Sequence, residues 1–176
     1  MSNEWYIPGW LIKAATEVLG AIDLDPASCA LANETVKAAR YFTEADNGLA
    51  QPWYGRVWLN PPFGVTGVPW RSAWQGQSVA GLWIEKLLAA YQAGDVTAAI
   101  LLAKADPKQR WFQPLMDYAL CFAGERVKFD RPGLPHETFQ FGTALIYFGP
   151  AQPRFIEVFR KIGDIYPAGS VIRMQR

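Results

Sequence analysis

The stretch Arg56-Val57-Trp58-Leu59-Asn60-Pro61-Pro62-Phe63-Gly64 decides how the rest of the chain is interpreted. Its apolar run, Val57 to Leu59, predicts a short buried strand. Asn-Pro-Pro ends that strand, because a proline cannot donate the next ladder hydrogen bond. The break leaves one polar side chain and two backbone carbonyls at the carboxyl end of a strand. Open α/β sheets bind ligands at that end, so we expect a functional site here.

The residues of this turn suit group transfer onto a planar amino group. An exocyclic amine is a poor nucleophile because its lone pair is delocalised into the attached ring. The Asn60 side-chain oxygen can accept one amine proton and a carbonyl of Pro61 or Pro62 the other, which favours a tetrahedral amine. Phe63 can stack on a planar base drawn out of a duplex. The simpler alternative is a proline-rich loop in which Asn60 only forms a turn.

The composition is that of a folded chain of ordinary domain size. Of its 176 residues, 51% are hydrophobic and 14% aromatic, which excludes a disordered protein and allows one domain with a sizeable core. The net charge is +1, so a nucleic-acid site has to be a local patch. Basic side chains outnumber acidic ones only in residues 89–176, and we expect phosphate contacts in that half.

Nothing in the sequence points to a metal, a disulfide or a membrane. The two cysteines, Cys29 and Cys121, and the single histidine, His136, form neither a zinc-binding pattern nor a disulfide framework. We interpret His136 as a loop residue and not as a catalytic base. The first residues do not resemble a signal peptide, and no apolar run reaches the length of a membrane span. We therefore expect a cytoplasmic protein.

Helical and strand patterns alternate along the chain. The predicted helices cover residues 8–20, 29–39, 82–93, 110–118 and 155–162. The predicted strands cover residues 21–24, 40–43, 57–59, 96–103, 119–123, 126–129 and 143–148. This order predicts an α/β sandwich that forms a single domain over residues 1–176, with a mainly parallel sheet and an antiparallel hairpin formed by its last strands.

Two segments near the predicted strand ends carry candidate ligand contacts. In residues 23–28, Asp23 and Asp25 precede a proline, and they are either a solvated strand edge or the acidic end of a cofactor site. Lys108 and Arg110 follow the strand 96–103 and are candidates for phosphate contacts.

A long loop, residues 65–80, begins directly after the Asn-Pro-Pro turn. Loops of this length beside a site are usually functional, so we expect this one to contact the substrate. Trp70 and Trp74 are four residues apart and would share one face of a helical turn, and Arg71 offers a phosphate or base-edge contact. Alternatively, the two tryptophans only attach the loop to the core.

Several motifs, in this order, resemble those of the phage-type DNA N-6-adenine methyltransferases. The matching segments are Asp23-Leu24-Asp25-Pro26-Ala27-Ser28, Arg40-Tyr41-Phe42-Thr43, Asp46-Asn47-Gly48-Leu49, Trp58-Leu59-Asn60-Pro61-Pro62-Phe63-Gly64, Trp111-Phe112, Gly124-Glu125-Arg126-Val127-Lys128-Phe129 and Phe141-Gly142-Thr143-Ala144-Leu145-Ile146-Tyr147-Phe148-Gly149. The resemblance covers nearly the whole chain. Asn-Pro-Pro-aromatic is typical of amino-group methyltransferases in general, and the flanking segments narrow it to this family.

The resemblance implies an S-adenosyl-L-methionine-dependent enzyme that acts on double-stranded DNA, with the seven-stranded methyltransferase version of the Rossmann fold. It assigns the catalytic motif to Asn60, Pro61, Pro62 and Phe63. It implies cofactor contacts at Asp23, Asp25, Pro26, Ala27, Ser28 and Asp46. The usual glycine-rich turn is absent, and Pro26-Ala27-Ser28 takes its place. If a phage or prophage encodes the protein, it would act in the host cytoplasm.

Alternatives stay open at this point. Asn as the first residue of the motif and Phe as the fourth both occur among amino methyltransferases, so the motif does not separate adenine N6 from cytosine N4. Enzymes that methylate RNA bases or a glutamine side chain carry a similar motif. A catalytically silent nucleic-acid-binding relative is a further alternative, and it would not bind S-adenosyl-L-methionine.

Overall fold

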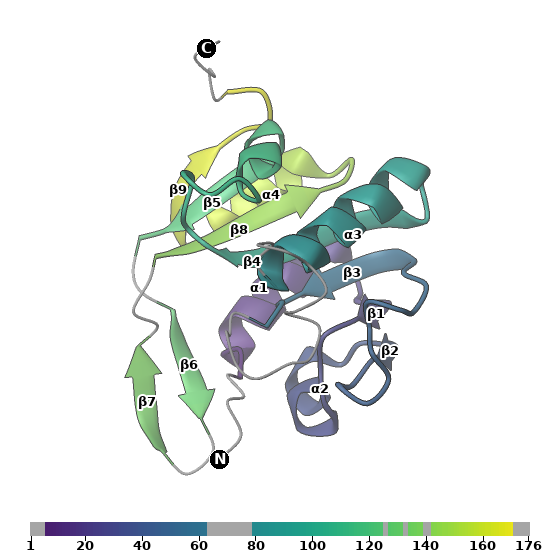
Figure 1. Cartoon of the computed structure of the whole chain (residues 1–176). Helices are drawn as coiled ribbons and strands as arrows, with labels where there is room; N and C mark the ends of the chain where they lie inside the picture. The colour runs from purple at the N-terminus through teal and green to yellow at the C-terminus, as the bar shows by residue number, and fades with distance from the viewer. Residues whose placement is uncertain (1–5, 63–78, 125–126, 132–133, 139–141, 171–176) are drawn as a thin grey trace.

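The structure, a computed structural model, describes residues 6–62, 79–124, 127–131, 134–138 and 142–170 (Figure 1). Within these residues a seven-stranded sheet has the strand order β2-β1-β3-β4-β8-β5-β9. Its strands are β1 (Leu24–Asp25), β2 (Arg40–Tyr41), β3 (Gly55–Leu59), β4 (Val96–Lys104), β5 (Ala119–Ala123), β8 (Thr143–Phe148) and β9 (Gly163–Tyr166). The predicted α/β sandwich is therefore confirmed at the level of a mixed sheet with helices, an arrangement consistent with a methyltransferase-like fold.

Helices cover both faces of the sheet (Figure 1). They are α1 (Gly9–Leu19), α2 (Ala30–Val36), α3 (Val79–Ala93), a 3₁₀ helix (Gln113–Asp117) and α4 (Gln152–Phe159). One core lies beneath α1 and α4, and it includes Trp58 and Leu102 of the sheet. The other lies beneath α3 and the 3₁₀ helix, and it includes Leu59 and Leu101. Within the described residues no helix is long and apolar enough to span a membrane.

Strand direction changes across the sheet. β1 pairs parallel with β2 and β3, and β3 pairs parallel with β4. β8 then lies antiparallel between β4 and β5, and β9 lies antiparallel beside β5. The prediction that the last strands form a hairpin at the side of the sheet is wrong for β8, which lies inside it. All six residues of β8 are buried, and such an apolar strand needs neighbours on both sides.

The predicted return strand 126–129 belongs to a separate structure. β6 (Lys128–Arg131) pairs antiparallel with β7 (Leu134–Thr138) in a two-stranded sheet of their own (Figure 1). His136 therefore lies in a strand, and its interpretation as a loop residue is wrong. This hairpin connects β5 to β8. Because β5 runs in the direction of β4, the hairpin leaves the main sheet at the carboxyl edge of its parallel strands.

Local signals placed both ends of α1 and the end of α3 to within one residue, whereas the helix predicted over 155–162 lies three residues earlier, as α4. α1 ends at the predicted glycine, since Gly20 has a φ of 81° and its N–H bonds to the Thr16 carbonyl at 2.7 Å. The helix predicted over 110–118 is instead the short 3₁₀ helix, with a proline in its first turn. The first predicted strand is displaced to Leu24–Asp25, and β9 was not predicted.

Gly163 gives a test of how β9 joins the sheet. A Cβ at this residue would overlap the carbonyl oxygen of Phe122 on β5, whereas a Cβ at Gly124 would meet only ordinary van der Waals neighbours. We expect Gly163→Ala to lower the free energy of unfolding by about 1–3 kcal/mol, the usual cost of overpacking. Urea denaturation should show little change for Gly124→Ala, and equal effects of the two substitutions would contradict this account of the edge.

Candidate active site

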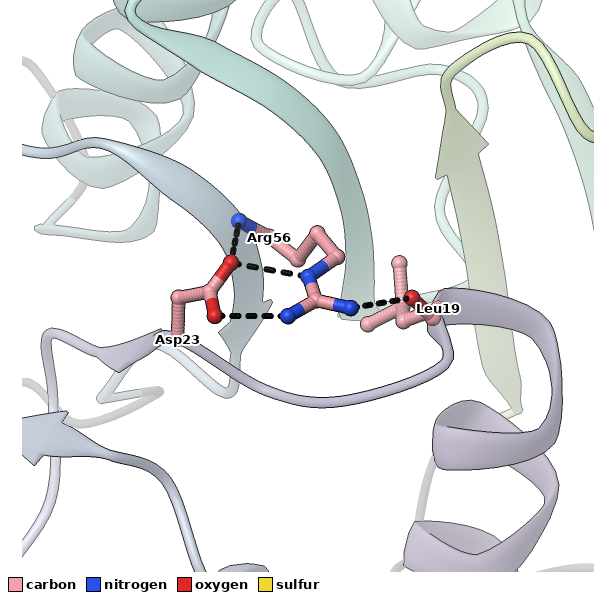
Figure 2. Close-up of polar contacts among 3 residues, drawn as sticks. All are labelled: Leu19, Asp23 and Arg56. Carbon is pink, nitrogen blue, oxygen red and sulfur yellow. Dashed lines mark hydrogen bonds and ion pairs between the residues drawn. The ribbon is translucent and has the colours of Figure 1, made fainter.

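The amino end of β3 is held by an ion pair (Figure 2). The Arg56 guanidinium donates from Nε to Oδ2 of Asp23 and from Nη2 to Oδ1, both at 2.8 Å, and the Arg56 backbone N–H also donates to Oδ2. These bonds hold the pKa of the Asp23 carboxyl below its usual value. Arg56 Nη1 also donates to the Leu19 carbonyl at 3.3 Å, which fixes the last turn of α1 beside β3.

The pair lies away from the Asn-Pro-Pro turn. Arg56 and Asn60 are four residues apart in β3 and its extension, so about 13 Å separates them along the strand. Asp23 adjoins Arg56, and both of its carboxylate oxygens accept hydrogen bonds from that residue. The structure thus gives Asp23 a partner at the amino end of the sheet. Of the two carboxylates predicted to contact a cofactor, we keep only Asp25 as a proposed contact.

Polar residues meet at the opposite, carboxyl edge of the sheet. Asp25 ends β1, Asn60 follows β3, and Lys104 ends β4. Thr143 begins β8 and is paired with Lys104 across the antiparallel ladder. Since β1, β3 and β4 run parallel and are neighbours, these four residues lie along one edge, at the ends of adjacent strands.

Three of these residues share a face of the sheet as well as an edge. The strand neighbours Leu24, Ala103 and Ala144 all lie in the core beneath α3. Because side chains alternate along a strand, Asp25, Lys104 and Thr143 face the side of α1. The last turn of α1 is bonded to the amino end of β3, so its first turn, with its partial positive charge, is directed toward the carboxyl edge.

Asn60 presents an acceptor without a partner. Its side-chain oxygen Oδ1 is buried and has no hydrogen-bond partner within the described part of the chain. Pro61 is buried and Pro62 is exposed, which is consistent with a turn fixed on one side to the core. A buried acceptor left unpaired costs free energy, about 1–3 kcal/mol. A ligand that brings an N–H to this oxygen would remove that cost.

The rest of the predicted catalytic and DNA-contacting segment lies outside the described residues. This applies to Phe63 and to the loop residues Trp70, Arg71 and Trp74. The last two residues of the predicted loop, 79 and 80, already belong to α3. Lys108 and Arg110 are described, and both are exposed in the turn segment that follows β4, the strand next to β3.

Asp25 is a buried carboxyl with few partners. Its exposed fraction is 3%, and its Oδ1 accepts a hydrogen bond from the Ala27 N–H at 3.3 Å. Burial raises its pKa to about 7, opposed by the nearby Ser28 hydroxyl and the Ala27 N–H. The Ser28 hydroxyl is close to this carboxyl but lacks hydrogen-bond geometry, and its oxygen is buried without a partner in the described residues.

The two segments predicted to bind a cofactor lie against each other. Gly48 fits so closely against Pro26 that a Cβ at residue 48 would overlap the Pro26 carbonyl oxygen. Asp46, two residues earlier, is exposed, and its Oδ2 accepts hydrogen bonds from Thr43 N at 2.8 Å and Thr43 Oγ1 at 2.7 Å. Residues 25–28 and 46–49 are therefore in direct contact beside the carboxyl end of β1.

Sequence reasoning missed two residues of this region. Thr143 has an exposed fraction of 2%, and its hydroxyl oxygen has no hydrogen-bond partner among the described residues. Lys86 of α3 donates to two carbonyls of the loop that carries Asp46. Thr143 could have been assigned to the site only if the pairing of β8 with β4 had been known. Lys86 could not have been found from the sequence, because a single lysine on an amphipathic helix does not indicate a role. Across the described residues, no group of three or more His, Cys, Asp or Glu side chains is arranged to hold a metal ion.

The order of these segments agrees with a known family. The family model described as DNA N-6-adenine-methyltransferase (Dam) matches residues 1–140 of the 176-residue chain. The chain belongs to the Dam family. The match includes the Asn60 turn, the segment 25–28 and the loop 46–49, which the structure brings to one edge of the sheet. It ends before β8. No curated protein and no solved structure matches the chain.

The burial of Asp25 predicts a pH-dependent stability. An unfolded aspartate titrates near 3.9, and the folded value is about 7. The protonated side chain therefore stabilises the fold below pH 4, and this contribution is lost as the pH rises through 7. Asp25→Asn stays neutral, so we expect its free energy of unfolding to match the wild type near pH 4. At pH 8 it should be higher than the wild type by at most about 4 kcal/mol. If urea titrations gave the same difference in free energy of unfolding between Asp25→Asn and the wild type at every pH from 4 to 8, the raised pKa of Asp25 would be contradicted.

Proposed function

We propose that this protein transfers a methyl group from S-adenosyl-L-methionine to the N6 amine of adenine in double-stranded DNA. Membership of the Dam family supports this activity at the level of the family. The observation that carries the proposal for this chain is the unpartnered, buried Oδ1 of Asn60 at the carboxyl end of β3. It is an acceptor at the edge of the sheet where α/β proteins bind ligands.

Asn60 would orient the amine that reacts. Its Oδ1 accepts one of the two amine protons, and a carbonyl of Pro61 or Pro62 accepts the other. Both acceptors are fixed in place, since the prolines restrict the backbone and Pro61 is buried. Held this way, the amine nitrogen is drawn towards tetrahedral geometry, and its lone pair is directed out of the plane of the ring.

When bound, S-adenosyl-L-methionine supplies an electrophilic methyl group on a positively charged sulfur. That methyl would pass to adenine N6, whose lone pair is directed by Asn60 and a proline carbonyl, and the electron pair of the broken S–C bond would stay on sulfur. The surplus amine proton is released to water, since Asn60 and the proline carbonyls are neutral acceptors that hold it only by a hydrogen bond. The contribution of Asn60 is therefore positioning and stabilisation of developing positive charge.

The residues beside β1 fit an adenosine-containing cofactor. Asp25 provides a buried carboxyl that can accept hydrogen bonds from hydroxyl groups, and Ser28 provides an unpartnered hydroxyl next to it. Ala27 and Ser28 are half-buried in this segment, whereas Pro26 and Gly48 are buried against each other and hold the two segments together. A buried carboxyl that raises the cost of folding is expected where a ligand makes use of it.

The DNA would approach across the carboxyl edge. Lys108 and Arg110 are exposed in the segment that follows β4, the strand next to β3, and can contact phosphates. We assign the remaining contacts to Trp70, Arg71 and Trp74, and base stacking to Phe63. Such an enzyme would meet its substrate in the cytoplasm.

Asn60→Ala tests the central assignment. We expect methyl transfer to duplex DNA to fall by about a hundred- to a thousandfold, because one positioned transition-state contact is lost. Asn60→Asp keeps an acceptor at the same position and should retain more activity than Asn60→Ala. The measurement is transfer of labelled methyl groups, with the thermal midpoint as a control for folding. Normal activity in a folded Asn60→Ala protein would contradict the proposed role of Asn60.

The methylated base can be identified in the same assay. We expect mass spectrometry of digested DNA to show N6-methyladenine. Appearance of N4-methylcytosine would instead support the alternative in which the same turn orients the cytosine amine. A wild-type protein that shows no thermal shift with S-adenosyl-L-methionine would identify a catalytically silent relative, since a ligand at 100 times its dissociation constant adds about 2.7 kcal/mol.

The two aspartates beside β1 should differ in cofactor binding. Asp25→Ala removes the buried carboxyl at the carboxyl edge, so calorimetry should show a weaker affinity for S-adenosyl-L-methionine. Asp23→Asn changes a carboxylate bonded to Arg56 at the other end of the strand, and it should lower stability while leaving the affinity of the folded protein unchanged. If Asp23→Asn weakened cofactor binding and Asp25→Ala did not, Asp23 and not Asp25 would be the cofactor contact.

A further inference from the structure

One lysine attaches the cofactor-side loop, residues 43–51, to α3. The Lys86 ammonium group donates to the carbonyl oxygens of Leu49 and Gln51, both at 2.6 Å. It also lies over the Trp53 ring, 5.3 Å from the ring centroid. Burial lowers the pKa of this half-buried group. The two carbonyls and the aromatic face replace the water that the charge has lost.

Two tryptophans, Trp53 just after the loop and Trp83 of α3, also connect the loop to α3. Trp53 Nε1 donates to the Gly48 carbonyl at 2.8 Å, and the Trp53 ring stacks on Trp83 of α3 with centroids 5.7 Å apart. Gly48 in turn fits against the Pro26 carbonyl. The position of the loop relative to residues 25–28 is thus set from α3, through Lys86 and Trp53.

The loop is closed by bonds of its own. Thr43 bonds to the Asp46 carboxylate, the Gln51 side chain donates to the Asp46 carbonyl at 2.7 Å, and the Ala50 N–H donates to the Asn47 carbonyl at 2.8 Å. These contacts lie within the loop and do not involve α3. Loss of the attachment to α3 would therefore move the loop as a unit and would not unfold it.

We propose that Lys86 is a positioning residue for the cofactor, holding residues 46–49 at the separation from residues 25–28 at which both segments contact the adenosine part of S-adenosyl-L-methionine. This inference rests on the proposed function. Lys86 acts through the Leu49 and Gln51 carbonyls and does not touch the cofactor itself. A lysine suits this purpose because its ammonium group has three donors, enough for two converging carbonyls.

The test is Lys86→Met, which keeps a side chain of similar length and removes every donor. We expect KM for S-adenosyl-L-methionine to rise about tenfold, the equivalent of one lost interaction of moderate strength, with kcat and KM for DNA unchanged. The dissociation constant of S-adenosylhomocysteine, measured by calorimetry, should rise by the same factor. The two ligands share the adenosine and amino-acid parts and differ in the methyl group, so an equal loss places the defect in the shared part and not at the methyl group.

Matched variants separate positioning from general destabilisation. Lys161→Met removes an exposed lysine beyond α4 and should leave both constants unchanged. Lys86→Arg retains N–H donors and should recover part of the affinity lost in Lys86→Met. Trp53→Phe keeps an aromatic ring, although a smaller one, and removes the bond to Gly48, so it should raise KM for the cofactor in the same way. This variant also decides the matter if Lys86→Met does not fold.

The outcomes that contradict the inference are specific. A lower thermal midpoint with an unchanged KM for the cofactor would give Lys86 a purely structural part and overturn the proposal. A fall in kcat with an unchanged KM for the cofactor would also overturn the proposal. If the wild-type protein binds neither S-adenosyl-L-methionine nor S-adenosylhomocysteine, the proposed function itself fails. Wild-type binding with equal affinity in Lys86→Met refutes only the positioning.

Discussion

The pairing of Asp23 with Arg56 fixes the alignment on which the rest of the structure depends. It joins the chain just before β1 to β3 by two side-chain bonds of 2.8 Å, and through Leu19 it also holds the end of α1. Both side chains are about one third exposed, so the pair contributes modestly to stability. Its bidentate geometry matters more, because a shift by one residue would break it. With β1 and β3 aligned at their amino ends, Asp25 and Asn60 lie together at the other edge.

Much of the fold could be predicted because its signals are local. The apolar run before Asn60 and the diproline after it define both the central strand and its end. Gly20 marks the end of α1, and the strands 119–123 and 143–148 follow from apolar segments, the second of which begins after Thr143. The Asn-Pro-Pro-aromatic motif and the flanking segments, each only a few residues long, together predicted the family that the comparison confirmed. Each of these features is contained within a few consecutive residues.

The remaining features depend on contacts between residues far apart in the sequence. Asp23 and Asp25 are indistinguishable by pattern, and only Arg56, 33 residues after Asp23, shows that their environments differ. The insertion of β8 between β4 and β5 likewise depends on pairing that no segment encodes alone. The short edge strand β9 carries no apolar run, since its residues alternate between half-buried and exposed. The orphaned oxygens of Asn60 and Thr143 become evident only when burial is known.

The central place of β8 has a consequence for how the chain folds as it is synthesised. β8 is the strand that joins β4 to β5, yet it is nearly the last strand to leave the ribosome. Until residues 143–148 emerge, the apolar β4 has an open edge, and β5 has no partner among the strands already made. Pairing across such a long stretch of chain is slow, and it leaves strand edges exposed to other chains. The nascent protein would therefore be most prone to aggregation just before its sheet is closed.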